Sequence, residues 1–358
     1  MTGKPAAAAP LAWRERPIVQ LTLARFREFY REPEAMFWTF VFPLLMAGGL
    51  GIAFRSKPPE VFTIGVSRSA PAADKLMEAF ARNTQIAAHL ADDTTGNREL
   101  RTGKIALLIG TAADGRLAYR LDDTRPEALS ARRLADDAIQ RAAGRQDPVT
   151  VGDELVRERG SRYIDFLIPG LLGMNMMGSS IWGLGFSVVD QRRKKLLKRF
   201  ISTPMSRVDY LASFLFSRLS LLVLEVIVMI GFGALAFGVP LRGSWLALGT
   251  ICLLGALGFG GLGLLIAARP KTVEGASGLM NLVMLPMWVF SGVFFSSTNF
   301  PAAMQPFIKA LPLTAVNNAL RANMLEGAGF AQIWPELTVI ATWLVVCFAL
   351  ALRLFRWK

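Results

Sequence analysis

Long apolar runs, separated by short polar segments, dominate the hydropathy pattern of this chain. A transmembrane helix needs about 20 consecutive, mostly apolar residues. Six runs approach or exceed that length, at residues 37–54, 164–189, 211–237, 245–268, 275–295 and 333–352. The pattern therefore predicts an all-α polytopic membrane bundle of six transmembrane helices, the first at 34–54 and the others within 161–358.

The segment between the first and second runs, 55–160, shows the shorter periodicities of a soluble domain. Strand-like stretches cover 61–66, 104–110 and 116–121, and apolar residues recur at helical spacing in 72–90 and 127–143. The order is strand, helix, strand, strand, helix. We therefore predict a small inserted α/β domain of about 100 residues, which is a normal size for a domain with its own core.

Two further segments have patterns that suit a membrane surface. Residues 18–31, within the N-terminal segment 1–33, interleave apolar and basic side chains and predict an amphipathic interfacial helix. Residues 290–314 are apolar but contain Pro301, Pro306 and Pro312. Such a stretch is too broken for a full span, so we expect a re-entrant or membrane-lying pair of short helices on the outer face, with the external re-entrant segment at 296–314.

Glycines gather in the fourth apolar run, at Gly255, Gly258, Gly260, Gly261 and Gly263. Small residues let helices approach closely in lipid, where packing replaces the hydrophobic driving force. We expect a tightly packed bundle there. Pore lining is compatible with the same pattern, and glycine content does not distinguish the two.

Composition and charge agree with a membrane protein and orient it. The chain is 53% hydrophobic and 19% charged, with a net charge of +13. Acids and bases nearly balance within 55–159, so the positive excess lies in the short segments that flank alternate spans. By the positive-inside rule both termini are cytoplasmic and the α/β domain is extracytoplasmic. This distribution removes the reason to expect nucleic-acid binding.

The start of the chain favours a retained first span over a cleaved signal peptide. Five arginines precede the first apolar run, and no A-x-A cleavage site follows it. Both cysteines, Cys252 and Cys347, fall in predicted spans and are expected to be packing residues.

Motifs for enzymatic chemistry are absent from the sequence. There is no G-x-x-x-x-G-K-[ST] P-loop, no H-E-x-x-H and no G-x-S-x-G. The single histidine, His89, is expected at a helix end in the α/β domain. We therefore expect no catalytic residues, metal site or cofactor in this chain.

Four polar residues inside the apolar runs are candidate functional residues: Asn175, Arg218, Glu225 and Asn281. Arg218 and Glu225 are seven positions apart, which is about 10 Å along a helix. We expect no direct pair at this spacing and an Arg218 side chain that extends to the cytoplasm. Glu225 then needs a partner, a wet cavity or a proton, so a structural hydrogen bond and a transport role both stay open.

The most basic segment joins the second and third spans, at 190–207. On a helix, Leu196, Leu197, Phe200 and Ile201 share an arc of about 140°, opposite Lys195, Lys198 and Arg199. Pro204 stops this helix near Ser202. The amphipathic helix is either a topology anchor on anionic lipid or an apolar knob that inserts into a cytoplasmic partner.

This loop resembles the cytoplasmic loop of ABC-2 type exporter permeases. The resemblance rests on the basic helix, the Ser202-Thr203-Pro204 turn and Ser206-Arg207, and it continues in Phe290-Ser291-Gly292-Val293-Phe294-Phe295, Pro301, Leu311-Pro312-Leu313-Thr314, Arg321 and Gly327. It covers all six spans and the inserted domain, as in the drug-efflux-like branch of the family.

The resemblance implies a set of partners and a role for the loop. Two permease subunits, identical or homologous, would form the pathway in a bacterial inner membrane, and two cytoplasmic P-loop ATPase subunits would bind ATP and Mg. The coupling residues would be Leu196, Leu197, Phe200, Ile201, Ser202, Thr203 and Pro204. Many relatives carry an E-x-E-x-G-T sequence where this chain has Gln-Arg-Arg-Lys-Lys at 191–195, so the ATPase surface that faces Lys194 and Lys195 is expected to be acidic.

These features predict an exporter subunit that moves an amphipathic drug-like or lipid-like molecule outward. Two other classes stay open. One is a membrane-anchored sensor or assembly factor whose extracytoplasmic domain binds a partner. The other is a proton-coupled carrier that uses Glu225.

Overall fold

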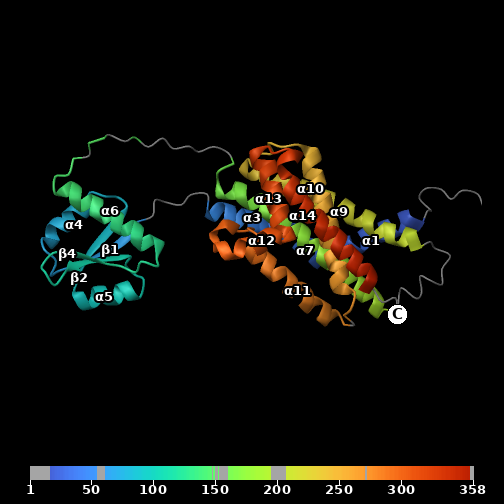
Figure 1. Ribbon diagram of the computed structural model, residues 1–358, viewed down its shortest axis with the longest axis horizontal. Coiled ribbons are helices and arrows are strands. Elements are labelled where there is room, and N and C mark those ends of the chain that lie inside the picture. The colour runs from blue at the N-terminus through green and yellow to red at the C-terminus, as the bar shows by residue number, and fades with distance from the viewer. Residues whose placement is uncertain are drawn as a thin grey trace, which may run out of the picture. The chain divides into compact units, whose positions relative to one another are not determined.

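The chain forms two compact units in the computed structural model (Figure 1), which describes residues 17–54, 61–146, 148–149, 152, 160–194, 207–270 and 272–354. A helical unit comprises Met1–Arg55 and Arg157–Lys358, and an α/β unit comprises Ser56–Val156.

Membrane-length helices dominate the helical unit. Among the described residues, six helices are long and apolar enough to cross a membrane: Pro33–Ala53, Tyr163–Arg193, Phe216–Phe237, Trp245–Ala267, Val273–Phe290 and Phe330–Leu354. The prediction of six membrane helices is confirmed at this level.

The first of these helices changes its winding in the middle. It consists of α2 (Pro33–Met36), a π-helical turn η2 (Phe37–Val41) and α3 (Phe42–Ala53). Pro43 lies in the first turn of α3 and has no backbone N–H to donate to the carbonyl of Thr39. The preceding amphipathic helix was predicted at 18–31 and is observed as α1 (Pro17–Arg31), which packs against α9 (Arg207–Phe237).

Helix α7 (Tyr163–Arg193) is the centre of the helical unit. Of the residues in its most apolar stretch, 83% are buried. The corresponding share is 17% in the first membrane helix and 22% each in α11 (Val273–Phe290) and α14 (Phe330–Leu354). It packs against α3, α9, α10 (Trp245–Ala267), α11 and α13 (Pro312–Arg321). A movement of α7 would therefore reach most of the bundle.

The proline-broken segment forms short helices, as its sequence predicts. These are η3 (Ser297–Asn299), η4 (Ala302–Met304) and α12 (Gln305–Ala310), followed by α13 and a π-helical turn η5 (Ala322–Glu326). Pro306 and Pro312 lie in the first turns of α12 and α13. Backbone N–H groups in a first turn have no partner within the helix, so a proline there removes no helical hydrogen bond. Helix α13 is largely buried against α7, α10 and α14, so this segment belongs to the packed bundle.

The α/β unit is built on a four-stranded sheet with the order β2-β1-β3-β4. Strands β1 (Phe62–Ser67), β2 (Ile86–Ala91) and β3 (Leu107–Thr111) are parallel, and β4 (Leu117–Arg120) is antiparallel to β3. Helices α4 (Ala73–Ala81) and α6 (Pro126–Ala142) lie on one side of the sheet and α5 (Asp93–Arg101) on the other (Figure 1). The predicted small α/β fold is confirmed.

The predicted helix at 72–90 is wrong in its second half. Helix α4 ends at Ala81, and residues 86–91 form strand β2, which pairs with β1 from Phe62↔Ile86 to Ser67↔Ala91. The sequence of β2 is rich in alanine, so its local propensity favours a helix and only the pairing with β1 makes it a strand. His89 therefore lies in a strand rather than at a helix end, with its Nε2 2.9 Å from Glu99 Oε2.

Candidate functional site

A buried polar cluster joins α7 and α9 in the middle of the helical unit. Helix α9 contributes Arg218 and Glu225, whose side chains are 9% and 1% exposed, and α7 contributes Ser179 and Ser180. The guanidinium Nη1 of Arg218 donates to Glu225 Oε1 over 2.8 Å. Two membrane-buried charges are thus placed in direct contact.

The two serines complete the cluster and tie it to α7. Arg218 Nη2 lies 2.7 Å from Ser179 Oγ and 2.9 Å from Ser180 Oγ, and Ser179 Oγ lies 3.0 Å from Glu225 Oε2. Glu225 Oε1 accepts from Arg218, whereas Oε2 shares the single Ser179 proton with the Asn175 carbonyl, which lies 2.7 Å from Ser179 Oγ. The cluster is a polar cross-link between two membrane helices as well as an ion pair within one helix.

The prediction that Arg218 and Glu225 do not pair was wrong. The prediction that the Arg218 side chain extends to the cytoplasm was also wrong, because this side chain is directed toward Glu225. The spacing of about 10 Å applies to the backbone alone. The Cα–Cβ bond of a helical residue tilts toward the N-terminus, which brings the Glu225 side chain toward Arg218. The long arginine side chain covers the remaining distance.

The remaining two candidates, Asn175 and Asn281, lie outside this cluster. Asn175, on α7, donates from Nδ2 to the carbonyl of Thr39 over 3.1 Å. That carbonyl is the one for which Pro43 provides no N–H, so Asn175 satisfies a backbone acceptor inside the bundle. Asn281 is exposed on the outer surface of α11, and the structure does not bring it to the other three.

A second polar centre lies around Arg321 and was not among the candidate site residues. The Arg321 guanidinium stacks on the Phe166 ring at 3.5 Å from its centroid and donates to the backbone carbonyls of Phe166 and Gly292. Asn317, one turn earlier on α13, donates to the carbonyl of Ser291 over 2.9 Å. These bonds hold α13 against α7 and against the turn after α11.

No local pattern could have revealed the second polar centre. Arg321, Ser291 and Gly292 were noted only as parts of the family resemblance. Their contacts are to backbone carbonyls far away in sequence, and such acceptors are the same for every residue type.

The proposed coupling residues Leu196, Leu197, Phe200, Ile201, Ser202, Thr203 and Pro204 lie outside the described residues. The structure does describe the approach to them. Helix α7 extends past the predicted span end at Val189 to Arg193, and Asp190 pairs with Arg193 and, over 2.7 Å, with Lys194. Arg192 donates to the carbonyl of Ala267 at the end of α10. Part of the basic segment is thus bound within the chain.

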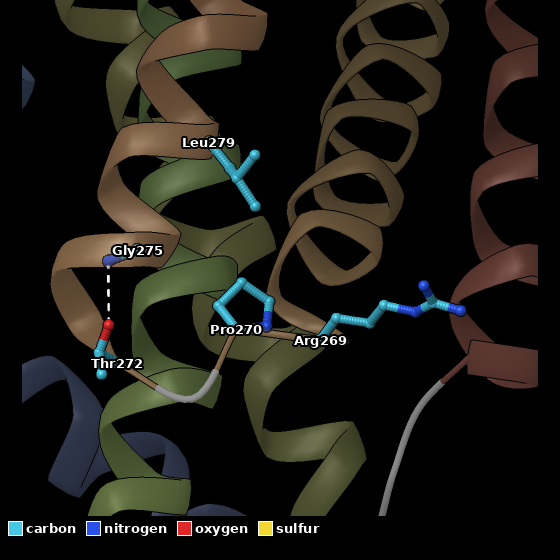
Figure 2. Close-up of a pocket in the computed structure, with 5 residues that line it drawn as sticks. All are labelled: Arg269, Pro270, Thr272, Gly275 and Leu279. Carbon is cyan, nitrogen blue, oxygen red and sulfur yellow. Dashed lines mark hydrogen bonds between the residues drawn. The ribbon is translucent and has the colours of Figure 1, made fainter.

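A surface depression of about 310 Å³ lies beside the turn between α10 and α11, lined by Arg269, Pro270, Thr272, Gly275 and Leu279 (Figure 2). Thr272 Oγ1 accepts from Gly275 N over 3.1 Å and so caps the start of α11. In Figure 2 the Arg269 side chain extends away from Thr272 and Gly275. None of the candidate residues lines this depression.

Six membrane-length helices in one unit, with α7 at its centre and polar cross-links between helices, define a polytopic membrane protein. The sequence profile of the ABC-2 family transporter proteins matches residues 34–353, which include these six helices except for the first residue, Pro33, and the last, Leu354. The chain therefore belongs to the ABC-2 family and is an ABC-2 type permease, as the resemblance of its loops predicts.

Individual relatives agree with this assignment. ABC transporter G family member 20 of Dictyostelium discoideum is 27% identical over 213 residues, which are 58% of this chain and 29% of that protein. Putative transport permease YvfS of Bacillus subtilis is 31% identical over 139 residues, 38% of this chain and 56% of YvfS. Daunorubicin resistance ABC transporter permease protein DrrB1 of Streptomyces coeruleorubidus is 27% identical over 203 residues, 55% of this chain and 70% of DrrB1.

The chain spans less than two thirds of the length of the first two of these relatives. Membership in the family and the permease names of the relatives support a transport role rather than an enzymatic one.

Proposed function

We propose that this chain is the membrane-spanning permease subunit of an ATP-driven exporter. Two cytoplasmic P-loop ATPase subunits would supply the energy, and a second permease subunit, identical or homologous, would complete the pathway. The observation that carries the proposal is the family match across 34–353, from the first membrane helix to the last. Both termini would be cytoplasmic in a bacterial inner membrane, with the α/β unit outside, as the charge distribution favours.

The substrate would be an amphipathic drug-like or lipid-like molecule that moves outward. Support comes from the name of DrrB1, which links that relative to daunorubicin resistance, and from YbhS of Escherichia coli, described as a probable multidrug ABC transporter permease and 27% identical over 165 residues. An amphipathic molecule partitions into the bilayer, from which a bundle of apolar helices can accept it.

The coupling route would begin at 196–204 and continue through α7. Closure of the ATPase dimer on ATP would press on the amphipathic segment directly after Lys194. Because α7 is one 31-residue helix that packs against α3, α9, α10, α11 and α13, a displacement at its end would reach the centre of the bundle. The polar cluster would transmit that displacement to α9.

The proposal is tested by purifying the full chain with and without the P-loop ATPase encoded beside it. We expect a stable complex whose ATPase activity changes on reconstitution into vesicles, and ATP-dependent movement of an amphipathic dye. Lack of a complex would contradict the proposal. Transport that survives ATP depletion but stops when the proton gradient collapses would support a carrier instead.

The coupling assignment has its own test in Leu197→Asp and Phe200→Asp. A charge on the apolar arc should prevent its insertion into the ATPase, so export should fall at least about tenfold while ATP hydrolysis continues. Lys198→Ser, on the opposite arc, is the control for a substitution in the same helix that leaves the apolar arc intact and adds no acid. Normal export by the two apolar-arc variants would refute the coupling role.

A further inference from the structure

A cavity of about 230 Å³ lies where α3 ends, α7 begins and α9 ends. It is lined by Gly51, Phe54, Arg162, Tyr163, Ile164, Ala236 and Phe237, all within the helical unit. Along α9, Phe237 is twelve residues beyond Glu225, or about 18 Å. The cavity is therefore separate from the Arg218–Glu225 cluster and needs its own explanation.

Aromatic rings form the walls of this cavity, and packing holds them in place. The Phe54 and Tyr163 rings lie 4.4 Å apart between centroids, and Phe237 packs edge-on against Phe232 at 5.8 Å. Tyr163 also donates its hydroxyl to the carbonyl of Phe294 over 2.9 Å. Fixed aromatic walls favour a flat apolar group, because stacking and edge contacts add to the gain from burial.

The floor depends on the glycine at position 51. A Cβ atom there would lie 2.8 Å from the Phe237 ring and 2.9 Å from the Ile164 side chain. A larger residue at position 51 would therefore have to displace the Phe237 ring or the end of the Ile164 side chain.

Arg162 is the cation among the described residues that line the cavity, and its orientation is fixed. Its Nε and Nη2 donate to the two carboxylate oxygens of Asp165 over 2.9 and 2.7 Å, and Asp165 is fully buried. Asp165 also accepts from the backbone N–H of Gly160 over 2.8 Å. Within the described part of the chain, Nη1 of Arg162 has no hydrogen-bond partner, and the side chain is 42% exposed. Two N–H donors are thus left for a ligand.

We propose that this cavity binds an amphiphile, namely a flat apolar group of one or two rings that carries an oxygen acceptor such as a carboxylate, sulfonate or phosphate. The apolar group would pack against the contacting Phe54 and Tyr163 rings on one side and Phe237 on the other, and the oxygen would accept from Arg162 Nη1. The volume fits, since a cavity of about 150 Å³ holds benzene. The lining is polar as well as aromatic, which suits an amphiphile rather than a wholly apolar ligand.

The inference rests on the proposed function in one respect, which is the identification of this ligand with the exported molecule. In the proposed orientation the cavity lies at the outer ends of the helices. A ligand of the same chemistry could also be an anionic membrane lipid. The experiment below separates these sources and does not involve the ATPase.

The test is photolabelling of the full chain in phosphatidylcholine vesicles with 4-benzoylbenzoate, an aryl carboxylate, followed by mapping of the labelled peptides. We expect saturable labelling of peptides that contain Phe54, Tyr163 or Phe237. Ala236→Trp should reduce it at least tenfold by filling the cavity. Ala234→Trp is the matched control, because Ala234 is an exposed alanine of the same helix outside the cavity.

A second variant addresses the role of Arg162 without leaving Asp165 unpaired. Arg162→Lys keeps a cation beside Asp165 but removes the planar fork, so half-maximal labelling should need at least about fivefold more probe at unchanged thermal stability. If soluble 2-naphthoate reduces labelling by the probe, the result supports the cavity as a binding site for an exported amphiphile. Competition by added phosphatidylglycerol supports the site with a lipid as ligand.

Labelling that Ala236→Trp does not reduce, or that spreads over lipid-facing helices without saturation, would overturn the inference. The proposed function would survive that result if the chain still exported a dye with ATP. Saturable labelling without any ATP-dependent export would uphold the cavity and count against the proposed function.

Discussion

Two opposite charges inside a membrane helix are tolerated here because each has a partner at hydrogen-bond distance. Arg218 and Glu225 pair directly, and Ser179 and Ser180 occupy further donors and acceptors of the pair. Removal of one member of a buried pair leaves the other charge in a medium that does not solvate it. Replacement of both by apolar residues avoids that cost.

This asymmetry gives a prediction for single and double variants. Glu225→Ala and Arg218→Ala should each destabilise the helical unit by about 3–5 kcal/mol, whereas Arg218→Met with Glu225→Leu should be within about 1 kcal/mol of the parent. Thermal unfolding in detergent can be followed with a thiol-reactive dye, because Cys252 and Cys347 are free and buried. If the double variant is as unstable as the single ones, the cluster is not an isolated charge pair.

The double variant also separates stability from transport. If it is stable but exports at least tenfold more slowly, the cluster transmits motion between α7 and α9. Normal export by a stable double variant would assign the cluster to stability alone.

At the scale of elements, close helix packing accounts for Gly263 of α10. A Cβ atom on Gly263 would lie 2.9 Å from the carbonyl oxygen and 3.0 Å from the Cα of Ile181, which are backbone atoms of α7. A Cβ atom on Gly185 of α7 would in turn lie 3.0 Å from the Gly263 carbonyl. The predicted tight packing is present at this crossing, where backbones approach as in other small-residue contacts in lipid.

We predict that Gly263→Ala destabilises the bundle by about 1–3 kcal/mol, because the backbone of α7 must move to accept the methyl group. Gly249→Ala, in the same helix, has no atom within 4 Å of its added Cβ and should be neutral or slightly stabilising. The thiol-dye thermal assay compares the two. Equal stability of both variants would show that the α7–α10 crossing adapts without cost.

At the scale of the whole molecule, the α/β unit has a core of its own. Its buried residues include Ile64, Val66, Phe80, Leu107 and Ile109, which pack the sheet against its helices. The contacts of the chain divide at residues 56 and 156, outside every strand and helix of this unit. A core that is complete within one segment does not need the membrane helices in order to form.

We therefore predict that a fragment of residues 56–156 folds alone. It should unfold cooperatively in urea and give dispersed amide resonances, and Phe80→Ala, which truncates a fully buried ring, should cost about 3–5 kcal/mol. Arg82→Ala, at the exposed end of α4, is the control and should change little. A fragment without cooperative unfolding would mean that the membrane helices are needed for this core.

The sequence predicts secondary structure more accurately in the helical unit than in the α/β unit. The positions of the membrane helices followed from hydropathy, and the ends differed by a few residues, as at α7, where polar Asp190 to Arg193 continue the helix. In the α/β unit, β2 was taken for helix because its alanines carry no strand signal, and α5 was missed because its exposed face is nearly all polar. Strand pairing with a distant segment overrode local propensity there.

The sequence by itself determined the number of membrane helices, their approximate limits and the family, because apolar length and the order of loop motifs are properties of contiguous residues. It also identified Asn175, Arg218, Glu225 and Asn281 as candidate polar residues in the spans, and Glu225 as one that needs a partner, a wet cavity or a proton. Only the tertiary structure decided which groups are their partners. Arg218 and Glu225 pair with each other across two helical turns and with serines of α7, and Asn175 binds the Thr39 carbonyl, to which Pro43 has no N–H to donate. The cavity beside Arg162 is likewise a property of three helix ends that meet only in the folded chain.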